Sequence, residues 1–169
     1  MIALIAGCAS SPPAPAPAGS QPPQAPSRQP PPNAATKAAS TKANLAIEKL
    51  RLSELFRGTP VLFALQPDGS LRAEVPLQFS FDAGKSVVKP PLAAVLDRVA
   101  AGQLNEITHL VVATPSDPAV KNSALVGERS ASVRDYLVAH GLATARVSVA
   151  AAAAAAVVKI VVTDTPPPP

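Results

Sequence analysis

The side chain that most clearly indicates chemistry is Arg129, a permanent cation in the stretch 122–141. At about 3.6 residues per turn, this stretch predicts a helix with a mostly apolar stripe along one side. The stripe consists of Asn122, Leu125, Arg129, Ser132, Val133, Tyr136 and His140. A guanidinium buried among apolar neighbours is costly unless an anion meets it. We therefore expect a carboxylate partner for Arg129, supplied either by the chain or by a ligand.

Asp82 and Asp117 are the candidate partners within the chain, and either could form a structural ion pair with Arg129. Asp117 also lies directly before Pro118, in a segment that predicts a turn ahead of the helix. An aspartate at such a place is commonly a turn or helix-cap residue. The residue types alone leave three roles open for Asp117: a turn or cap, an ion pair, and ligand binding.

The remaining polar residues do not indicate catalysis. His109 falls within an expected strand and His140 at a helix end, and neither has a nucleophile and an orienting group in a recognisable arrangement. The sequence holds no metal-ligand spacing and no phosphate-binding loop. The net charge is +4, yet the chain lacks a Lys/Arg cluster interleaved with aromatic residues. We expect a protein that is not an enzyme, needs no metal or cofactor and does not bind nucleic acid.

The elements that must position Arg129 follow from hydrophobic periodicity. Residues 89–102 predict an amphipathic helix, because Leu92, Val95, Leu96 and Val99 recur at helical spacing. Alternating or β-branched segments predict strands at 77–81, 107–113, 146–149 and 157–163. With the helix at 122–141, the order is strand, helix, strand, helix, strand, strand. This order predicts an α+β fold in which two helices pack on one face of a small mixed sheet.

The chain ahead of this domain divides into further segments. Residues 44–75 predict a helix and then a β-hairpin that leads into the domain. The expected buried side of that helix carries Ile47, Leu50, Leu55 and Phe56. Ten of the 21 prolines lie between Pro12 and Pro32, so residues 9–43 predict a disordered, Pro/Ala-rich linker. Residues 165–169 predict a short tail of the same kind.

The first eight residues contain a second motif. Ile5-Ala6-Gly7-Cys8 resembles a bacterial lipobox, in which a signal peptidase cuts before the cysteine and the cysteine is acylated, for example with palmitate. Residues 1–8 are then a truncated lipoprotein signal peptide, because no Lys or Arg precedes a short apolar run. The resemblance implies a lipid anchor through Cys8 at the periplasmic face of the outer membrane. The alternative is an ordinary apolar N-terminus with a stray cysteine.

Two further motifs carry a resemblance to the OmpA-like, peptidoglycan-associated domain family. Phe81-Asp82-Ala83-Gly84-Lys85-Ser86-Val87-Val88-Lys89-Pro90 is similar to the family's F-D-x-x-x-x-x-L-x-P. Asn122, Leu125 and Arg129, continuing through Val133, Tyr136 and Leu137 to Gly141-Leu142, resemble the family's second helix. Ala145-Arg146-Val147 and Val158-Lys159-Ile160-Val161-Val162 are similar to its last two strands. The resemblance implies a βαβαββ sandwich over residues 76–164.

In this family an aspartate at the end of the second strand and the helix arginine grip the diaminopimelate of the peptidoglycan stem peptide. The resemblance implies that Arg129 is this arginine and Asn122 the asparagine that shapes the loop. The family's G-H-T-D is replaced here by Ala113-Thr114-Pro115-Ser116-Asp117. Counted back from Arg129, Thr114 occupies the aspartate's position, so Asp117 can serve only if a shortened loop brings it into place.

Two functions follow from the resemblance. One is an outer-membrane lipoprotein whose periplasmic domain binds peptidoglycan through Arg129, Asp117 and Asn122, and so tethers membrane to cell wall. The other is a degenerate domain without glycan binding, which serves as a structural or protein-interaction module of an outer-membrane assembly. Envelope proteins are possible partners in either case.

Overall fold

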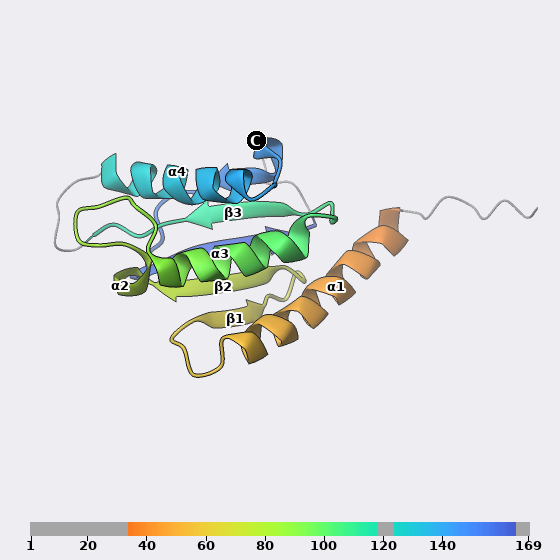
Figure 1. Ribbon diagram of the computed structural model, residues 1–169. Helices are drawn as coiled ribbons and strands as arrows, with labels where there is room; N and C mark the ends of the chain where they lie inside the picture. Colours follow the sequence, from red (N-terminus) through yellow and green to blue (C-terminus); the bar gives the residue numbers. More distant parts are fainter. Residues whose placement is uncertain (1–33, 118–123, 165–169) are drawn as a thin grey trace, which may run out of the picture. The chain divides into compact units, whose positions relative to one another are not determined.

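The computed structural model describes residues 34–117 and 124–164 (Figure 1). The lipobox with Cys8, residues 9–33 of the expected linker, Asn122 and the tail 165–169 lie outside the described residues.

The described domain is built on a five-stranded sheet with the strand order β1-β2-β5-β3-β4. The strands are β1 (Leu62–Leu65), β2 (Leu71–Pro76), β3 (His109–Ala113), β4 (Val147–Val149) and β5 (Val157–Thr163). All neighbours are antiparallel except β3 and β4, which run parallel. The expectation of a small mixed sheet in an α+β fold is confirmed.

Two helices cover the central strands on one face of this sheet, and the helix α1 (Ala34–Leu55) described below packs on the same face beside β1 and β2. The two helices over the central strands are α3 (Pro90–Gln103) and α4 (Ala124–Ala139), which lie side by side in Figure 1. Burial alternates along the strands that they cover, because successive side chains of a strand point to opposite faces. In β5, Val158, Ile160 and Val162 are buried. Leu92, Leu96 and Val99 of α3 join the same core, as their helical spacing predicts.

The segment 77–81, expected to be a strand, is instead mostly a single helical turn, α2 (Leu77–Ser80). The alternation that suggested a strand is misleading, because Ser80 is buried and Gln78 is exposed. The Ser80 hydroxyl donates to the Pro76 carbonyl at 3.0 Å, and the Phe81 N–H donates to the Leu77 carbonyl at 3.0 Å. These local bonds stabilise a turn where the apolar pattern alone favours extension.

The helix ahead of the hairpin, α1 (Ala34–Leu55), also differs from expectation. It begins at Ala34, so residues 34–43 are helical rather than part of a disordered linker. Its buried residues include Leu45 and Leu52, whereas Ile47, Leu50 and Leu55 are exposed. Leu45 and Leu52 are seven residues apart, two turns of one face, and they join the core with Leu71 and Ala73 of the neighbouring strand β2. The buried face of α1 carries fewer large apolar residues than the exposed face. Hydrophobic periodicity therefore predicted the wrong face of the helix as the buried one.

The strand expected at 146–149 is shorter in the structure. A 3₁₀ turn, η1 (Thr144–Arg146), comes first, and β4 starts at Val147. The alanine run 150–156 that follows forms no helix; its Ala153 makes a parallel bridge to Pro115.

The buried face of α1 generates a stability prediction. Leu52 is 1% exposed and Leu50 is 65% exposed on the same helix, so the two form a matched pair. We expect Leu52→Ala to lower the free energy of unfolding by about 2–5 kcal/mol, because it opens a cavity in the core. Leu50→Ala should change it by less than about 0.5 kcal/mol. Urea unfolding followed by circular dichroism measures both, and equal effects would show that α1 is not packed on the sheet.

A second prediction concerns the contact between α3 and α4. The Tyr136 hydroxyl donates to Asp97 Oδ1 at 2.8 Å. This hydrogen bond, with partial burial, raises the pKa of Tyr136 above its ordinary value of 10.0. The stabilisation that this hydrogen bond gives the folded state is therefore present below about pH 10. It is lost as the pH rises through the pKa of Tyr136 in the folded protein.

The chain has one tyrosine, so its ultraviolet absorbance titration reports Tyr136 directly. We expect a midpoint above 10.0 in the folded protein, which Asp97→Ala lowers and the control Asp135→Ala leaves unchanged. A wild-type midpoint at or below 10.0 would contradict the contact.

Candidate functional site

Helix α4 places Arg129 in the interior, as its position on the stripe predicts. The residue is 0% exposed, and Leu125, Ser130, Val133 and Leu137 are buried on the same helix. Ser132 and Tyr136 are only partly buried, and His140 is exposed, so the buried face is rotated slightly from the expected stripe. A cation within the apolar face of a helix needs compensation from elsewhere.

Asp117 supplies that compensation. Arg129 Nη2 lies 2.9 Å from Asp117 Oδ2, and the two side chains are 1% and 6% exposed. Asp82, the other candidate acid, contributes only its backbone: its carbonyl accepts from Nη2 at 3.1 Å. The Lys85 carbonyl accepts from Arg129 Nε at 2.9 Å, and the guanidinium lies 5.0 Å from the centre of the Phe81 ring. Among the described residues, Nη1 has no hydrogen-bond partner.

Asp117 also fixes the loop that follows Phe81. Its Oδ2 accepts from the Gly84 N–H at 3.3 Å. Gly84 has a φ of +69°, a left-handed conformation that glycine adopts without a steric penalty. One carboxylate therefore joins the loop after α2, the segment after β3 and the helix α4.

Thr114, at the position where the resemblance places the family's acid, has a structural role. It is 0% exposed, and its hydroxyl donates to the Val126 carbonyl at 2.9 Å. Because its proton is used there, Thr114 Oγ1 accepts from Ser130 Oγ, 2.7 Å away. The threonine thus ties the end of β3 to α4, and the chain then turns so that Asp117, three residues later, reaches Arg129. Asp117 is therefore the acid that pairs with Arg129 in the structure.

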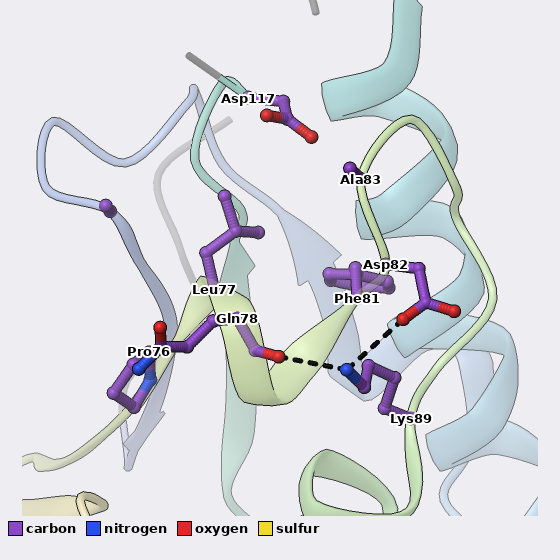
Figure 2. Close-up of a pocket in the computed structure, with 9 residues that line it drawn as sticks. Pro76, Leu77, Gln78, Phe81, Asp82, Ala83, Lys89 and Asp117 are labelled. Atoms are coloured by element: carbon purple, nitrogen blue, oxygen red, sulfur yellow. Dashed lines mark hydrogen bonds and ion pairs between the residues drawn. The ribbon is translucent and has the colours of Figure 1, made fainter. Parts of the chain in front are cut away.

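A hollow of about 470 Å³ adjoins this pair, and Figure 2 shows its walls. Its lining includes Leu77, Phe81, Asp82, Ala83, Lys89 and Asp117. Asp117 is part of the lining although its side chain is only 6% exposed, whereas Arg129 is not part of it. A hollow of this size with apolar walls and a few charged groups is typical of small-molecule sites.

Lys89 and Asp82 place two further charges on the wall. Lys89 Nζ lies 3.2 Å from Asp82 Oδ1 and donates to the Gln78 carbonyl at 3.1 Å, as Figure 2 shows. The hydrogen bond and the charge of Lys89, with a smaller effect of Lys85, hold the pKa of Asp82 below its ordinary value of 3.8. Asp82 is therefore ionised at neutral pH.

Lys89 is the wall residue that sequence reasoning missed. Its place before Pro90 marked it only as the start of a helix. Lys89 and Asp82 are seven residues apart, and their contact depends on the path of the loop between them. That loop has no hydrophobic periodicity from which its path could be predicted.

The two histidines lie away from this hollow. His109 is in β3, and His140 Nδ1 lies 3.4 Å from Asp97 Oδ1 while its ring stacks on Tyr136. Within residues 34–117 and 124–164, no group of three His, Cys, Asp or Glu side chains is placed to hold a metal ion. None of the helices in these ranges is both long and apolar enough to cross a membrane.

Comparison with solved structures defines the class of the domain. A protein described as MotB-like from Desulfovibrio vulgaris matches with a TM-score of 0.59 at 13% identity, over 75% of this chain and 93% of that one. The cell wall anchor of the T6SS from Pseudomonas aeruginosa matches with a TM-score of 0.53 at 16% identity, over 70% of this chain and 96% of its own. The periplasmic domain of Helicobacter pylori MotB (residues 90–256) matches with a TM-score of 0.51 at 17% identity, over 63% and 81%.

At these identities the likeness establishes the fold. The described domain is a divergent domain of OmpA-like fold, as the two sequence motifs indicated. No family model and no curated protein sequence matches the chain.

The buried ion pair generates a stability prediction with a control on the same helix. Asp117→Ala leaves Arg129 buried without its carboxylate, so we expect a loss of about 3–5 kcal/mol in the free energy of unfolding. Asp135 pairs with Arg134 but is 67% exposed, so Asp135→Ala should cost less than about 1 kcal/mol. Urea titration followed by circular dichroism suits a chain without tryptophan. Similar losses for the two variants would mean that Arg129 is not buried in solution.

Proposed function

We propose that this domain binds peptidoglycan non-covalently, through the diaminopimelate of the stem peptide. The observation that carries the proposal is the charged hollow bordered by Asp117, which is paired with Arg129. The OmpA-like fold supports it, since one protein of similar structure is described as a cell wall anchor. Fold alone is a weak guide to function, so the proposal depends on the side chains of the hollow.

The proposed chemistry is recognition of a free amine. A stem peptide with diaminopimelate carries an ammonium group, which needs an anion within hydrogen-bonding distance. Asp117 lines the hollow and provides that anion. Arg129 acts through Asp117: its ion pair and its bonds to the Asp82 and Lys85 carbonyls hold the carboxylate and the adjoining loop in place. We propose that Asn122 shapes the same rim, as the family resemblance implies.

The lipid anchor is a separate part of the proposal. We propose that Cys8 is acylated and holds the domain at the periplasmic face of the outer membrane, on the strength of the lipobox resemblance. Helix α1 starts at Ala34, so residues 9–33, 25 in all, would connect anchor and domain. A chain of that length spans at most roughly 80–90 Å when fully extended.

A second function is tested by the same experiment, because the partner of Arg129 is a residue of the chain itself and not a ligand. With Asp117 already paired to it, the site can be purely structural, and the domain then serves as a protein-interaction or structural module of an outer-membrane assembly.

Co-sedimentation of the full chain with purified diaminopimelate-containing sacculi separates the two functions. We expect the wild type to sediment with the sacculi. Asp117→Asn keeps an oxygen for Arg129 but removes the negative charge, so binding should weaken about tenfold or more. The matched control Asp135→Asn, an exposed acid on α4, should bind like the wild type.

Thermal unfolding by circular dichroism checks that each variant is folded. Wild-type protein that stays in the supernatant, or Asp117→Asn that binds as well as Asp135→Asn, would overturn the peptidoglycan proposal and favour the structural module.

A further inference from the structure

A second hollow, of about 200 Å³, lies between α1 and the C-terminal end of α3. Its wall is mostly polar, with the side chains of Thr41, Asn44, Glu48, Gln103, Glu106 and Thr108. The hollow beside Asp117 lies at the other end of α3, where Lys89 precedes the helix. Because α3 has 14 residues, its two ends are roughly 20 Å apart. The second hollow is therefore a separate site, and no sequence motif assigned it a role.

Gln103 presents a fixed amide group to the second hollow. The residue is only 2% exposed. Arg146 Nη2 donates to Thr108 Oγ1 at 3.0 Å, and the Thr108 hydroxyl donates in turn to Gln103 Oε1 at 2.7 Å. This chain of hydrogen bonds orients the amide, so Nε2 points away from Thr108. No described residue accepts a hydrogen bond from Nε2, which leaves a buried donor at the wall.

Glu48 presents an acceptor to the same hollow. Its Oε1 is buried and has no hydrogen-bond partner among the described residues. The other oxygen, Oε2, lies 3.6 Å from Nη1 of Arg51, whose side chain is 67% exposed. The carboxylate is seated against Gly102 of α3, where an added Cβ atom would lie 2.7 Å from Oε1. The glycine therefore leaves the space that the carboxylate occupies.

The charges around the second hollow favour an uncharged ligand. Two acids, Glu48 and Glu106, belong to its wall. Arg51 lies beside Glu48, and Arg146 is bonded to the Gln103 and Thr108 carbonyls at 2.8 and 2.7 Å. These two cations offset the two acids. The amide hydrogens of Gln103 at the wall also disfavour a cation.

The unpaired groups define the chemistry of the ligand. A buried donor and a buried acceptor are each costly without a partner. A hydroxyl group both donates and accepts, so a molecule with several hydroxyl groups satisfies Gln103 and Glu48 together. The volume of about 200 Å³ is several times the roughly 30 Å³ of one water and below the roughly 300–1,000 Å³ of drug-sized sites. A single sugar ring is of intermediate size.

We propose that the second hollow binds one saccharide unit. Glu48 Oε1 accepts from a sugar hydroxyl, Gln103 Nε2 donates to a neighbouring sugar oxygen, and the C–H groups of the ring pack on Leu45 and Ile47, which also belong to the wall. The sugar reproduces the hydrogen bonds of the waters that it displaces. The inference does not rest on diaminopimelate binding. The glycan strand of peptidoglycan and another polysaccharide are two sources of the same chemistry.

Nuclear magnetic resonance titration of the isotope-labelled full chain tests the site, followed at the side-chain amide signal of Gln103. The probes are diacetylchitobiose and cellobiose, two disaccharides with the same linkage, of which only the first carries acetamido groups. We expect a saturable shift of the Gln103 signal with at least one of them. A shift with diacetylchitobiose alone points to acetamido sugars such as those of peptidoglycan; a shift with cellobiose points to a different polysaccharide.

Two glycine variants provide a matched pair. Gly102→Ala pushes the Glu48 carboxylate from its seat, so binding of the disaccharide should weaken about tenfold or more. Gly127→Ala adds the same methyl group to α4, where nothing lies within 4 Å, and should bind like the wild type. Glu48→Gln gives a second test that keeps the shape of the side chain, with the exposed Glu54→Gln on the same helix as its control.

Thermal unfolding by circular dichroism identifies the folded variants, and only these are compared. No saturable shift with either disaccharide would overturn the inference, and so would Gly102→Ala and Glu48→Gln that bind as well as their controls. Such a failure leaves diaminopimelate recognition to its own experiment, because Asp117 lines the hollow at the other end of α3.

Discussion

The domain depends on one electrostatic requirement: a guanidinium in the interior must be neutralised where it lies. Arg129 and Asp117 meet this requirement at 2.9 Å with almost no exposure to solvent. Buried ion pairs are often no more stabilising than apolar residues of similar size, so stability is not a sufficient reason for this one. The pair does constrain the positions of the two loops. Arg129 is hydrogen-bonded to Asp117 on one loop and to the Asp82 and Lys85 carbonyls on the other, so both loops are held against α4.

The surrounding fold provides the rigid parts of that arrangement. The central strands β5 and β3 are buried on the face covered by α3 and α4, and Thr114 anchors the end of β3 to α4 by two hydrogen bonds. The acid that pairs with Arg129 is Asp117, three residues after Thr114, and it belongs to the lining of the hollow.

The sequence predicted most of the scaffold because the strands β3 and β5 and the helices α3 and α4 have strong periodicity. It also predicted that Arg129 is buried and that Asp117 is one of its two candidate partners. The prediction failed where local hydrogen bonds or tertiary contacts determine the structure. Residues 77–80 form a helical turn, stabilised by the hydrogen bond from Ser80, and not a strand. In α1 the side that packs on the sheet is the one with Leu45 and Leu52, although the opposite side is more apolar. Lys89 was missed because its importance comes from a loop conformation, and single-sequence patterns contain no information about loop paths.

The alanine run 150–156 has a consequence for how this domain could change over time. The backbone of Ala150 donates to the Val112 carbonyl, that of Ala153 to the Thr114 carbonyl, and the Ala156 carbonyl accepts from Leu77. The run is therefore held by main-chain hydrogen bonds. Ala156 is part of the wall of the hollow, and its methyl group adds no polar atom there. Side chains there are free to vary without loss of these bonds. A polar substitution at Ala156 would therefore add a polar group to the hollow without rebuilding the scaffold.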